Sequence, residues 1–230
     1  MQEEKEELVS LDEIKTEFQL ERMILFSDAV FAIVITLMAI EIKIPESHEK
    51  LDQHTLLHEL KHLTPVIMSY IVSFFFIGTI WYQHLKIFSL VKDYDKGLVV
   101  RNLALLFFVG LFPFCASVIT RSQGTSIAFF IYLGIILLCI ITQYALQYYI
   151  VVQRPRLRVN TELSEHLLEL WKKKILIVGF IIAFILCVIS FLLIDDPELR
   201  SLIPLWILPV VFVYRLMLRK KNKPKAASSA

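Results

Sequence analysis

The stretch from Arg22 to Ile44, RMILFSDAVFAIVITLMAIEIKI, decides the fold class of this chain. From Met23 to Ile40 it is apolar except for Ser27, Asp28 and Thr36. At about 1.5 Å per residue, about eighteen helical residues cover about 27 Å, which is close to the thickness of a bilayer's hydrocarbon core. The stretch therefore predicts a membrane-spanning helix with one charge inside it, and such a charge normally faces protein or water rather than lipid.

The composition of the whole chain agrees with a membrane class. Of the 230 residues, 57% are apolar, and the mean hydropathy is +0.64. This exceeds the apolar share of soluble domains, so we expect an all-α, polytopic membrane protein in the lipid bilayer. The net charge of only +2 makes nucleic acid an unsuitable partner. The three cysteines lie inside apolar runs, and their odd number suggests neither a disulfide framework nor a metal-thiolate cluster.

Further apolar runs follow the first one. They predict five more spans, at Leu63–Gln83, Asn102–Thr120, Ser122–Gln153, Ile175–Ile194 and Ser201–Leu218. Pro113 lies inside the third span and should kink it or interrupt its hydrogen bonds. We expect three parts: an amphipathic lead-in over residues 1–21, a six-helix transmembrane domain over residues 22–218 and a basic tail over residues 219–230.

The distribution of Lys and Arg predicts the topology. With six spans, 19 of the 24 basic residues fall on one side of the membrane and five on the other. Because basic residues concentrate in cytoplasmic segments, we expect both termini in the cytoplasm. Omitting the sixth helix would place its basic tail on the opposite side.

Three histidines in the connection after the first span recur every fourth residue. On a helix, His54, His58 and His62 would share one face, which is a spacing compatible with zinc. Only Glu59 is nearby as an acidic ligand, so we interpret this segment as a solvated loop helix and predict no metal site and no cofactor.

The first span has two distinct faces when its residues are placed at about 100° intervals. An aliphatic stripe with a single hydroxyl lies on one face and consists of Ile33, Thr36, Leu37 and Ile40. Asp28 lies on the opposite face, toward neighbouring helices. The stripe is compatible with simple packing or with lining a pore, because lipid-facing, buried and pore-lining stripes have the same pattern.

Polar residues of three spans should meet at the cytoplasmic end. Asp28 lies near that end of the first span, Trp81 and His84 end the second, and Asn102 begins the third. We therefore expect a buried hydrogen-bonded network among Asp28, His84 and Asn102, which could serve either gating or helix packing alone.

The same residues carry a family resemblance. The pattern R-x-x-x-F-S-D at Arg22, Phe26, Ser27 and Asp28, followed by AVFAIVITL, resembles the signature of the transmembrane protein 175 family of potassium channels. Further likenesses lie in the second and third spans, at Trp81, His84, Asn102 and Pro113-Phe114.

This resemblance implies a function and an assembly. It implies a homotetrameric channel for monovalent cations, with potassium as the permeant ion, in which the first helix of each subunit lines the pore. Ile33, Leu37 and Ile40 would then form hydrophobic constriction rings and Thr36 a hydroxyl layer. The signature residues Arg22, Phe26, Ser27 and Asp28, with Trp81, His84 and Asn102, would hold that helix to the second and third.

Two other functions compete with a channel. A proton-coupled transporter could use Asp28 and His84 as a relay, although such proteins show internal repeats or interrupted helices at matching positions. An intramembrane enzyme ranks last, because the chain contains no H-E-x-x-H, G-x-S-x-G or paired catalytic carboxylates.

Overall fold

The computed structural model describes residues 2–40, 42, 53–121, 126–159, 163–196 and 199. The chain divides into two compact units, residues 1–161 and 162–230, and each is considered by itself. The first unit contains α1 (Gln2–Ile40), α2 (Gln53–Phe88), α3 (Lys96–Gly110), α4 (Phe112–Arg121) and α5 (Ser126–Tyr148). A π-helix (Tyr149–Gln153) and a 3₁₀ turn (Pro155–Leu157) follow α5. The second unit contains α6 (Leu163–Leu193).

The prediction of an all-α, multi-pass membrane protein is confirmed. Among the described residues, the helical segments that are long and apolar enough to cross a membrane number five: Ile14–Ile40, Val66–Phe88, Lys96–Ile119, Ile127–Gln153 and Leu163–Leu193. In the part of the chain that the structure describes, the only extended pairing is an isolated bridge between Val91 and Arg158. The sixth predicted span and the basic tail lie outside the described residues.

Two helix boundaries differ from those expected. The first helix continues without a break from Gln2 to Ile40, so the acidic lead-in and the first span are one helix of 39 residues. The helix of the fifth span begins at Leu163, twelve positions before the predicted Ile175. Helix propensity explains the earlier start, because the segment before Ile175 is rich in Leu, Glu and Lys, which are strong helix formers.

Pro113 interrupts the third span as predicted. Helix α3 ends at Gly110, and α4 begins at Phe112 after a turn at Leu111. Proline has no N–H to donate to the carbonyl four residues earlier, and its ring clashes with that carbonyl. The Leu111 N–H instead bonds to the Phe108 carbonyl at 3.2 Å, and the Cys115 N–H restarts the ladder at the Leu111 carbonyl.

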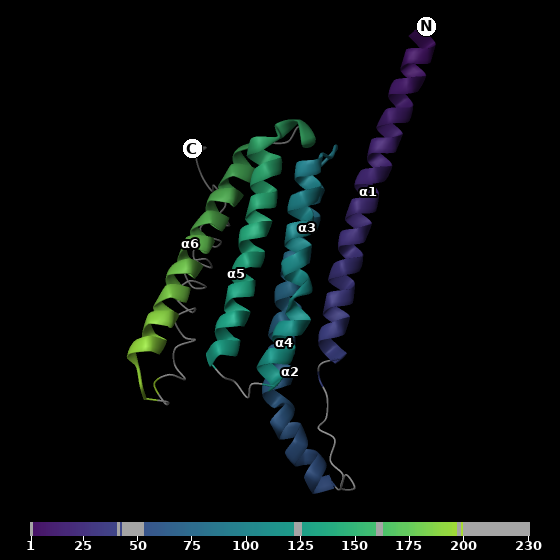
Figure 1. Cartoon of the computed structure of the whole chain (residues 1–230). Coiled ribbons are helices and arrows are strands. Elements are labelled where there is room, and N and C mark those ends of the chain that lie inside the picture. The colour runs from purple at the N-terminus through teal and green to yellow at the C-terminus, as the bar shows by residue number, and fades with distance from the viewer. Residues whose placement is uncertain are drawn as a thin grey trace, which may run out of the picture. The chain divides into compact units, whose positions relative to one another are not determined.

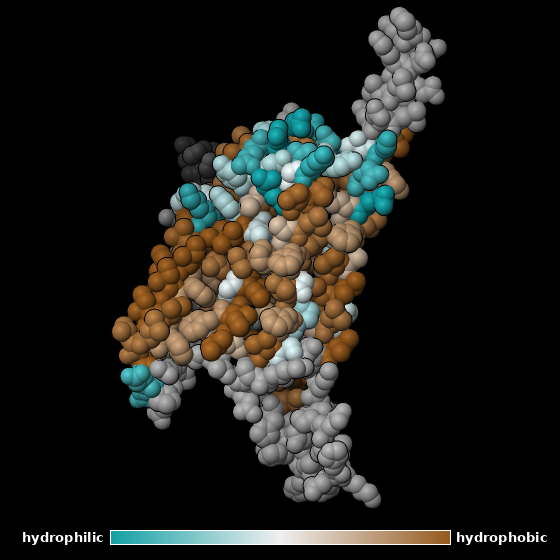
Figure 2. All heavy atoms as spheres, in the orientation of Figure 1, coloured by the Kyte–Doolittle hydropathy of each residue, from teal (hydrophilic) through white to brown (hydrophobic). Residues whose placement is uncertain are grey.

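Helix α3 has a central place in the first unit. It contacts α1 on one side and α5 on the other, and the three helices lie side by side in Figure 1. The buried apolar residues of its core face are Leu98, Leu105, Leu106 and Val109. Apolar residues cover the middle of the unit in Figure 2, and hydrophilic residues gather at the end where α3 begins. This pattern matches a hydrocarbon layer bordered by an aqueous phase.

Candidate functional site

One face of α1 is buried against its neighbours. Ser27, Phe31, Val34 and Met38 are almost fully buried and recur every three to four residues, which places them on one side of the helix. Helix α1 contacts α2, α3 and α4. The helical period of the sequence thus produces a packed face in the structure.

A chain of hydrogen bonds joins this face of α1 to α2 and α3. The Asn102 amide Nδ2 donates to the Ser27 hydroxyl at 2.8 Å, and this hydroxyl donates to the Met23 carbonyl at 2.8 Å. The amide oxygen of Asn102 faces His84 Nε2 at 2.9 Å. Because that oxygen can only accept, His84 Nε2 carries the proton and donates. The side chains of Ser27, His84 and Asn102 are all buried. This series of hydrogen bonds therefore fixes the direction of each bond and the tautomer of the imidazole.

Aromatic rings enclose the His84 imidazole. The Phe88 ring lies 4.3 Å and the Phe31 ring 5.5 Å from it, measured between ring centroids. His84 Nδ1 is buried and has no hydrogen-bond partner in the described part of the chain. The site therefore holds the ring rigidly by packing on its faces and by one hydrogen bond at its edge.

Asp28 belongs to a separate contact. Its Oδ1 accepts a hydrogen bond of 2.9 Å from Trp81 Nε1, which is a second link between α1 and α2. Within the described residues, no hydrogen bond joins Asp28 to His84. The single network expected from the sequence is thus two neighbouring networks, with Asp28 paired to Trp81 and His84 paired to Asn102.

The other two signature residues lie outside both networks. The Arg22 guanidinium lies 5.9 Å from the centroid of the Phe18 ring, and Phe26 is exposed. In the described part of the chain, Arg22 has no hydrogen bond to Ser27 or Asp28. The structure therefore brings Ser27, but not Arg22 or Phe26, into the hydrogen-bonded chain.

The aliphatic stripe of α1 lies on its free face. Ile33, Leu37 and Ile40 are 55%, 44% and 61% exposed. The Thr36 hydroxyl lies 2.9 Å from the Ile33 carbonyl and 3.1 Å from the Ala32 carbonyl, so its proton is committed to its own helix. A hydroxyl has one proton and two lone pairs, so the Thr36 oxygen can still coordinate a cation.

Residues 22–113 match the model of a protein family described as endosomal/lysosomal potassium channel TMEM175. This match contains all the residues of both networks and the whole stripe. Over these residues the chain is similar to the TMEM175 family.

Individual proteins show the same likeness over about half of the chain. A potassium channel of Chryseobacterium is 35% identical over 105 residues, which cover 46% of this chain and 49% of the relative. A zebrafish endosomal/lysosomal proton channel TMEM175 is 27% identical over 123 residues, which cover 51% of this chain and 21% of the relative. The chain thus aligns with about half the length of the bacterial relative.

A solved structure extends the likeness to the fold. The crystal structure of a lysosomal potassium-selective channel TMEM175 homologue from Chamaesiphon minutus superposes with a TM-score of 0.67 and 25% identity. The superposition covers 90% of this chain and all of that one. The likeness in fold therefore extends beyond residue 113, where the family match ends.

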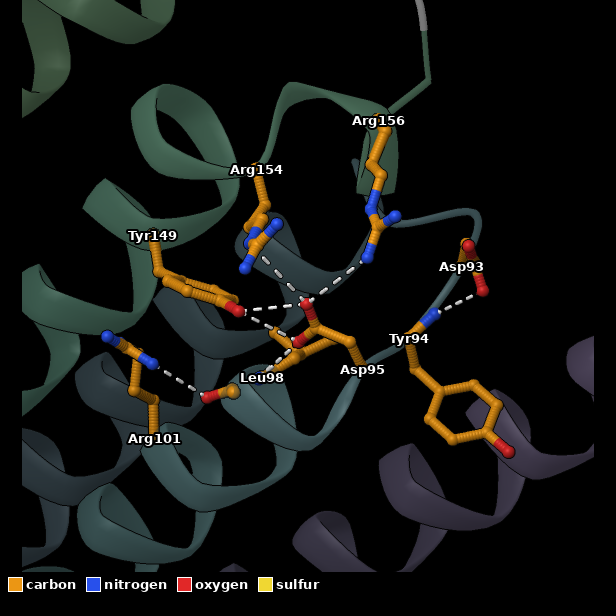
Figure 3. A network of polar contacts seen from close by, with 9 residues as sticks. Asp93, Tyr94, Asp95, Leu98, Arg101, Tyr149, Arg154 and Arg156 are labelled. Carbon is orange, nitrogen blue, oxygen red and sulfur yellow. Dashed lines mark hydrogen bonds and ion pairs between the residues drawn. The ribbon is translucent and has the colours of Figure 1, made fainter.

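A third cluster in this chain was not predicted from the sequence. Asp95 precedes α3 and caps it, accepting a hydrogen bond of 2.8 Å from the Leu98 N–H. The Tyr149 hydroxyl donates to both carboxylate oxygens, at 2.8 and 3.0 Å, as Figure 3 shows. Arg154 and Arg156 approach the same carboxylate. An aspartate just before an apolar helix is the usual signal of an N-cap, but nothing in the sequence indicates its distant partners.

The surroundings of Asp95 determine its charge. Desolvation raises the pKa of this carboxyl group, but the Leu98 N–H, the Tyr149 hydroxyl and the two arginine charges together lower the pKa below its ordinary value. Asp95 is therefore ionised at neutral pH and serves as the negative centre of the cluster.

Gly97 makes room for the Tyr149 ring. A Cβ atom at this position would lie 2.6 Å from Tyr149 Cζ, closer than real Cβ atoms approach. The centroid of the same ring lies 3.8 Å from the Arg101 guanidinium carbon. Only a residue without a side chain lets the hydroxyl reach Asp95.

The histidine series after the first span stays a sequence prediction. Its backbone is helical within α2, but the side chains of His54, His58 and His62 lie outside the described residues. Among the side chains that are described, no three His, Cys, Asp or Glu residues gather in a group able to hold a metal ion.

Proposed function

We propose that this chain forms a potassium-permeable cation channel of the bacterial inner membrane. In this proposal four copies assemble around one axis, with the α1 helices lining the pore and both termini in the cytoplasm. The names of the bacterial relatives and the family support a potassium channel.

The two faces of α1 carry this proposal. Ser27 and Asp28 attach one face to α3 and α2 through one buried and one exposed hydrogen bond. The opposite face presents Ile33, Leu37 and Ile40, which are about half exposed in the structure. A helix attached on one side and free on the other suits a position at the axis of an oligomer.

Hydrophobic rings and one hydroxyl layer would select the ion in such a pore. Each aliphatic ring forms a narrow dry zone, where an ion loses hydration at a large cost. The Thr36 oxygen, with its proton bonded to the helix backbone, would offer its lone pairs to the ion. This arrangement predicts modest rather than extreme discrimination against sodium.

A proton-coupled transporter is less well supported by the site. A relay between Asp28 and His84 would need a hydrogen-bonded path between them, and in the described residues each has a different partner. The zebrafish relative is named a proton channel, so a test of function should measure protons as well as potassium.

Current recordings would test the channel directly. We expect the purified protein in planar bilayers to give single-channel currents whose reversal potential follows the potassium gradient more closely than the sodium gradient. A reversal potential that follows only the pH gradient would replace potassium with protons as the permeant ion. Transport that saturates and never shows unitary currents would contradict a channel.

A pair of leucine variants would locate the pore. Leu37 of the stripe and Leu103 on α3 are 44% and 48% exposed, so they are matched in residue type and exposure. Leu37→Ala should raise the conductance and weaken the preference for potassium, because a wider ring is wetted more easily. Leu103→Ala should leave both unchanged. Equal effects of the two substitutions would remove α1 from the pore.

The assembly needs its own measurement. Chemical cross-linking in the membrane, read by mass, should give a ladder that ends at four subunits. A ladder that ends at two would contradict a pore formed by four α1 helices.

A further inference from the structure

We propose that the arginine cluster around Asp95 is a binding site for the phosphate headgroup of an anionic phospholipid. The site consists of Arg101, Arg154 and Arg156 with Asp95 at their centre, and it is independent of the ion that the protein conducts. Figure 3 shows the guanidinium groups of Arg154 and Arg156 directed toward the Asp95 carboxylate.

The two outer arginines retain most of their hydrogen-bonding capacity. Arg154 Nε lies 3.8 Å and Arg156 Nη2 3.9 Å from the same oxygen, Asp95 Oδ2. These distances are beyond those of direct hydrogen bonds. That oxygen already accepts the Tyr149 hydroxyl at 2.8 Å. The two side chains are 50% and 68% exposed, so their remaining N–H groups are accessible to a ligand.

The cluster has more positive than negative charge. Arg154 and Arg156 approach the Asp95 carboxylate, and Arg101 contacts the Tyr149 ring that bonds to it, so this set carries a net charge of about +2. Arg101 is held by the Gly97 carbonyl at 3.0 Å and by the face of the Tyr149 ring. Nearby, Arg158 Nη1 is buried without a hydrogen-bond partner in the described residues. Paired, planar N–H donors of this kind match the geometry of phosphate oxygens.

The loop that carries Arg154 and Arg156 is ordered by backbone hydrogen bonds without a ligand. The Arg154 N–H bonds to the Tyr149 carbonyl at 2.8 Å, and the Lys92 N–H bonds to the Leu157 carbonyl at 2.8 Å. The Val159 N–H also bonds to the Leu90 carbonyl at 2.8 Å. A site that is already ordered loses less entropy on binding.

The location of the cluster favours a lipid over a free anion. It lies where α3 begins and the π-helix ends, at the end of the unit where hydrophilic residues follow the apolar zone in Figure 2. Val100 and Val152 are exposed beside Arg101 and Arg154 in the sequence, and they can contact the upper part of an acyl chain. Basic pockets between spans at the cytoplasmic border are typical sites for anionic headgroups.

Lipid retention by the full-length protein would test the proposal. Purified protein would be incubated with phosphatidylglycerol or phosphatidylcholine, and bound lipid measured by native mass spectrometry. Arg154→Gln combined with Arg156→Gln should weaken phosphatidylglycerol binding by about tenfold or more, since about two basic contacts at the membrane surface are lost. The matched control, Lys172→Gln with Lys174→Gln, removes the same charge from α6 and should change binding by less than about threefold.

Further measurements separate the possible outcomes. Arg154→Lys with Arg156→Lys keeps the charge but loses the planar fork, so it should bind at an intermediate level and also reveal whether loss of binding reflects loss of folding. Equal weakening by the glutamine pair and the α6 control would show general attraction only and overturn the site. Unchanged binding in the glutamine pair would also overturn it. If inorganic phosphate at the same concentration displaces phosphatidylglycerol, the cluster is a site for free phosphate, and the proposal of a lipid ligand is contradicted.

Discussion

The hydrogen bond between His84 and Asn102 should be measurable as a coupling energy. Asn102→Leu removes the acceptor for His84 Nε2 and the donor to Ser27, so the buried imidazole is left without any hydrogen bond in the described residues. Interhelical hydrogen bonds in membrane proteins average about 0.6 kcal/mol. A buried donor without a partner costs about 1–3 kcal/mol. Two lost bonds and one orphaned donor therefore give a destabilisation of about 2–4 kcal/mol.

A double-mutant cycle isolates this coupling from changes in packing. His84→Leu should also destabilise the protein, because it leaves the Asn102 oxygen unpaired. The destabilisation of the double variant should be smaller than the sum of the two single destabilisations by about 1–2 kcal/mol, because neither partner of the pair is then left without a hydrogen bond. The assay is unfolding by sodium dodecyl sulfate in mixed micelles, followed by circular dichroism. Strictly additive effects would refute the argument that the bond, rather than volume, stabilises this site.

Three other predictions concern the Asp95 cluster and the stripe. Gly97→Ala should destabilise the protein by about 1–3 kcal/mol because the new Cβ displaces the Tyr149 ring; Gly110→Ala, with no atom within 4 Å of its Cβ, is the control and should not lower the melting temperature. Because folding depresses the pKa of Asp95, its stabilisation is fully present above the ordinary value of 3.8 and is lost as the pH falls through the lower pKa of the folded state. Melting temperatures should therefore decrease more steeply below that value in the parent than in Asp95→Asn, and parallel curves would contradict the ionised role. Thr36→Val should lower the ratio of potassium to sodium permeability in bi-ionic recordings without preventing assembly, and an unchanged ratio would leave selectivity to the aliphatic rings.

The period of the first span was sufficient to predict its two faces. Met38 and Val34 became buried and Leu37 and Ile40 exposed, because a regular helix fixes the angle between successive side chains. The interruption at Pro113 was equally predictable, since the missing N–H is a local property. Local chemistry of this kind is visible in any single segment of the sequence.

Contacts between distant segments were harder to predict. The span ends and the charge topology placed Asp28, His84 and Asn102 at one end of the bundle. The choice of Trp81 as the partner of Asp28 depends on helix rotation, which the sequence of one chain does not specify. The Asp95–Tyr149 contact joins residues 54 positions apart through a π-helix. The extra residue in a π-turn shifts side chains away from the regular helical period, so pattern analysis does not locate them.

The unbroken length of α1 has a mechanical consequence. At about 1.5 Å per residue, a helix of 39 residues is a rod of about 58 Å, of which only the part from Ile14 is apolar enough to span a bilayer. Because no turn separates the N-terminal part from the stripe, a sideways force on the acidic arm acts as a torque about the Ser27 and Asp28 attachments. A tilt of about 5° about that point would move Ile40, about 18 Å away, by about 1.6 Å. In the proposed channel the N-terminal arm would thus act as a lever, and a partner that pulls on it would move the stripe without contacting it.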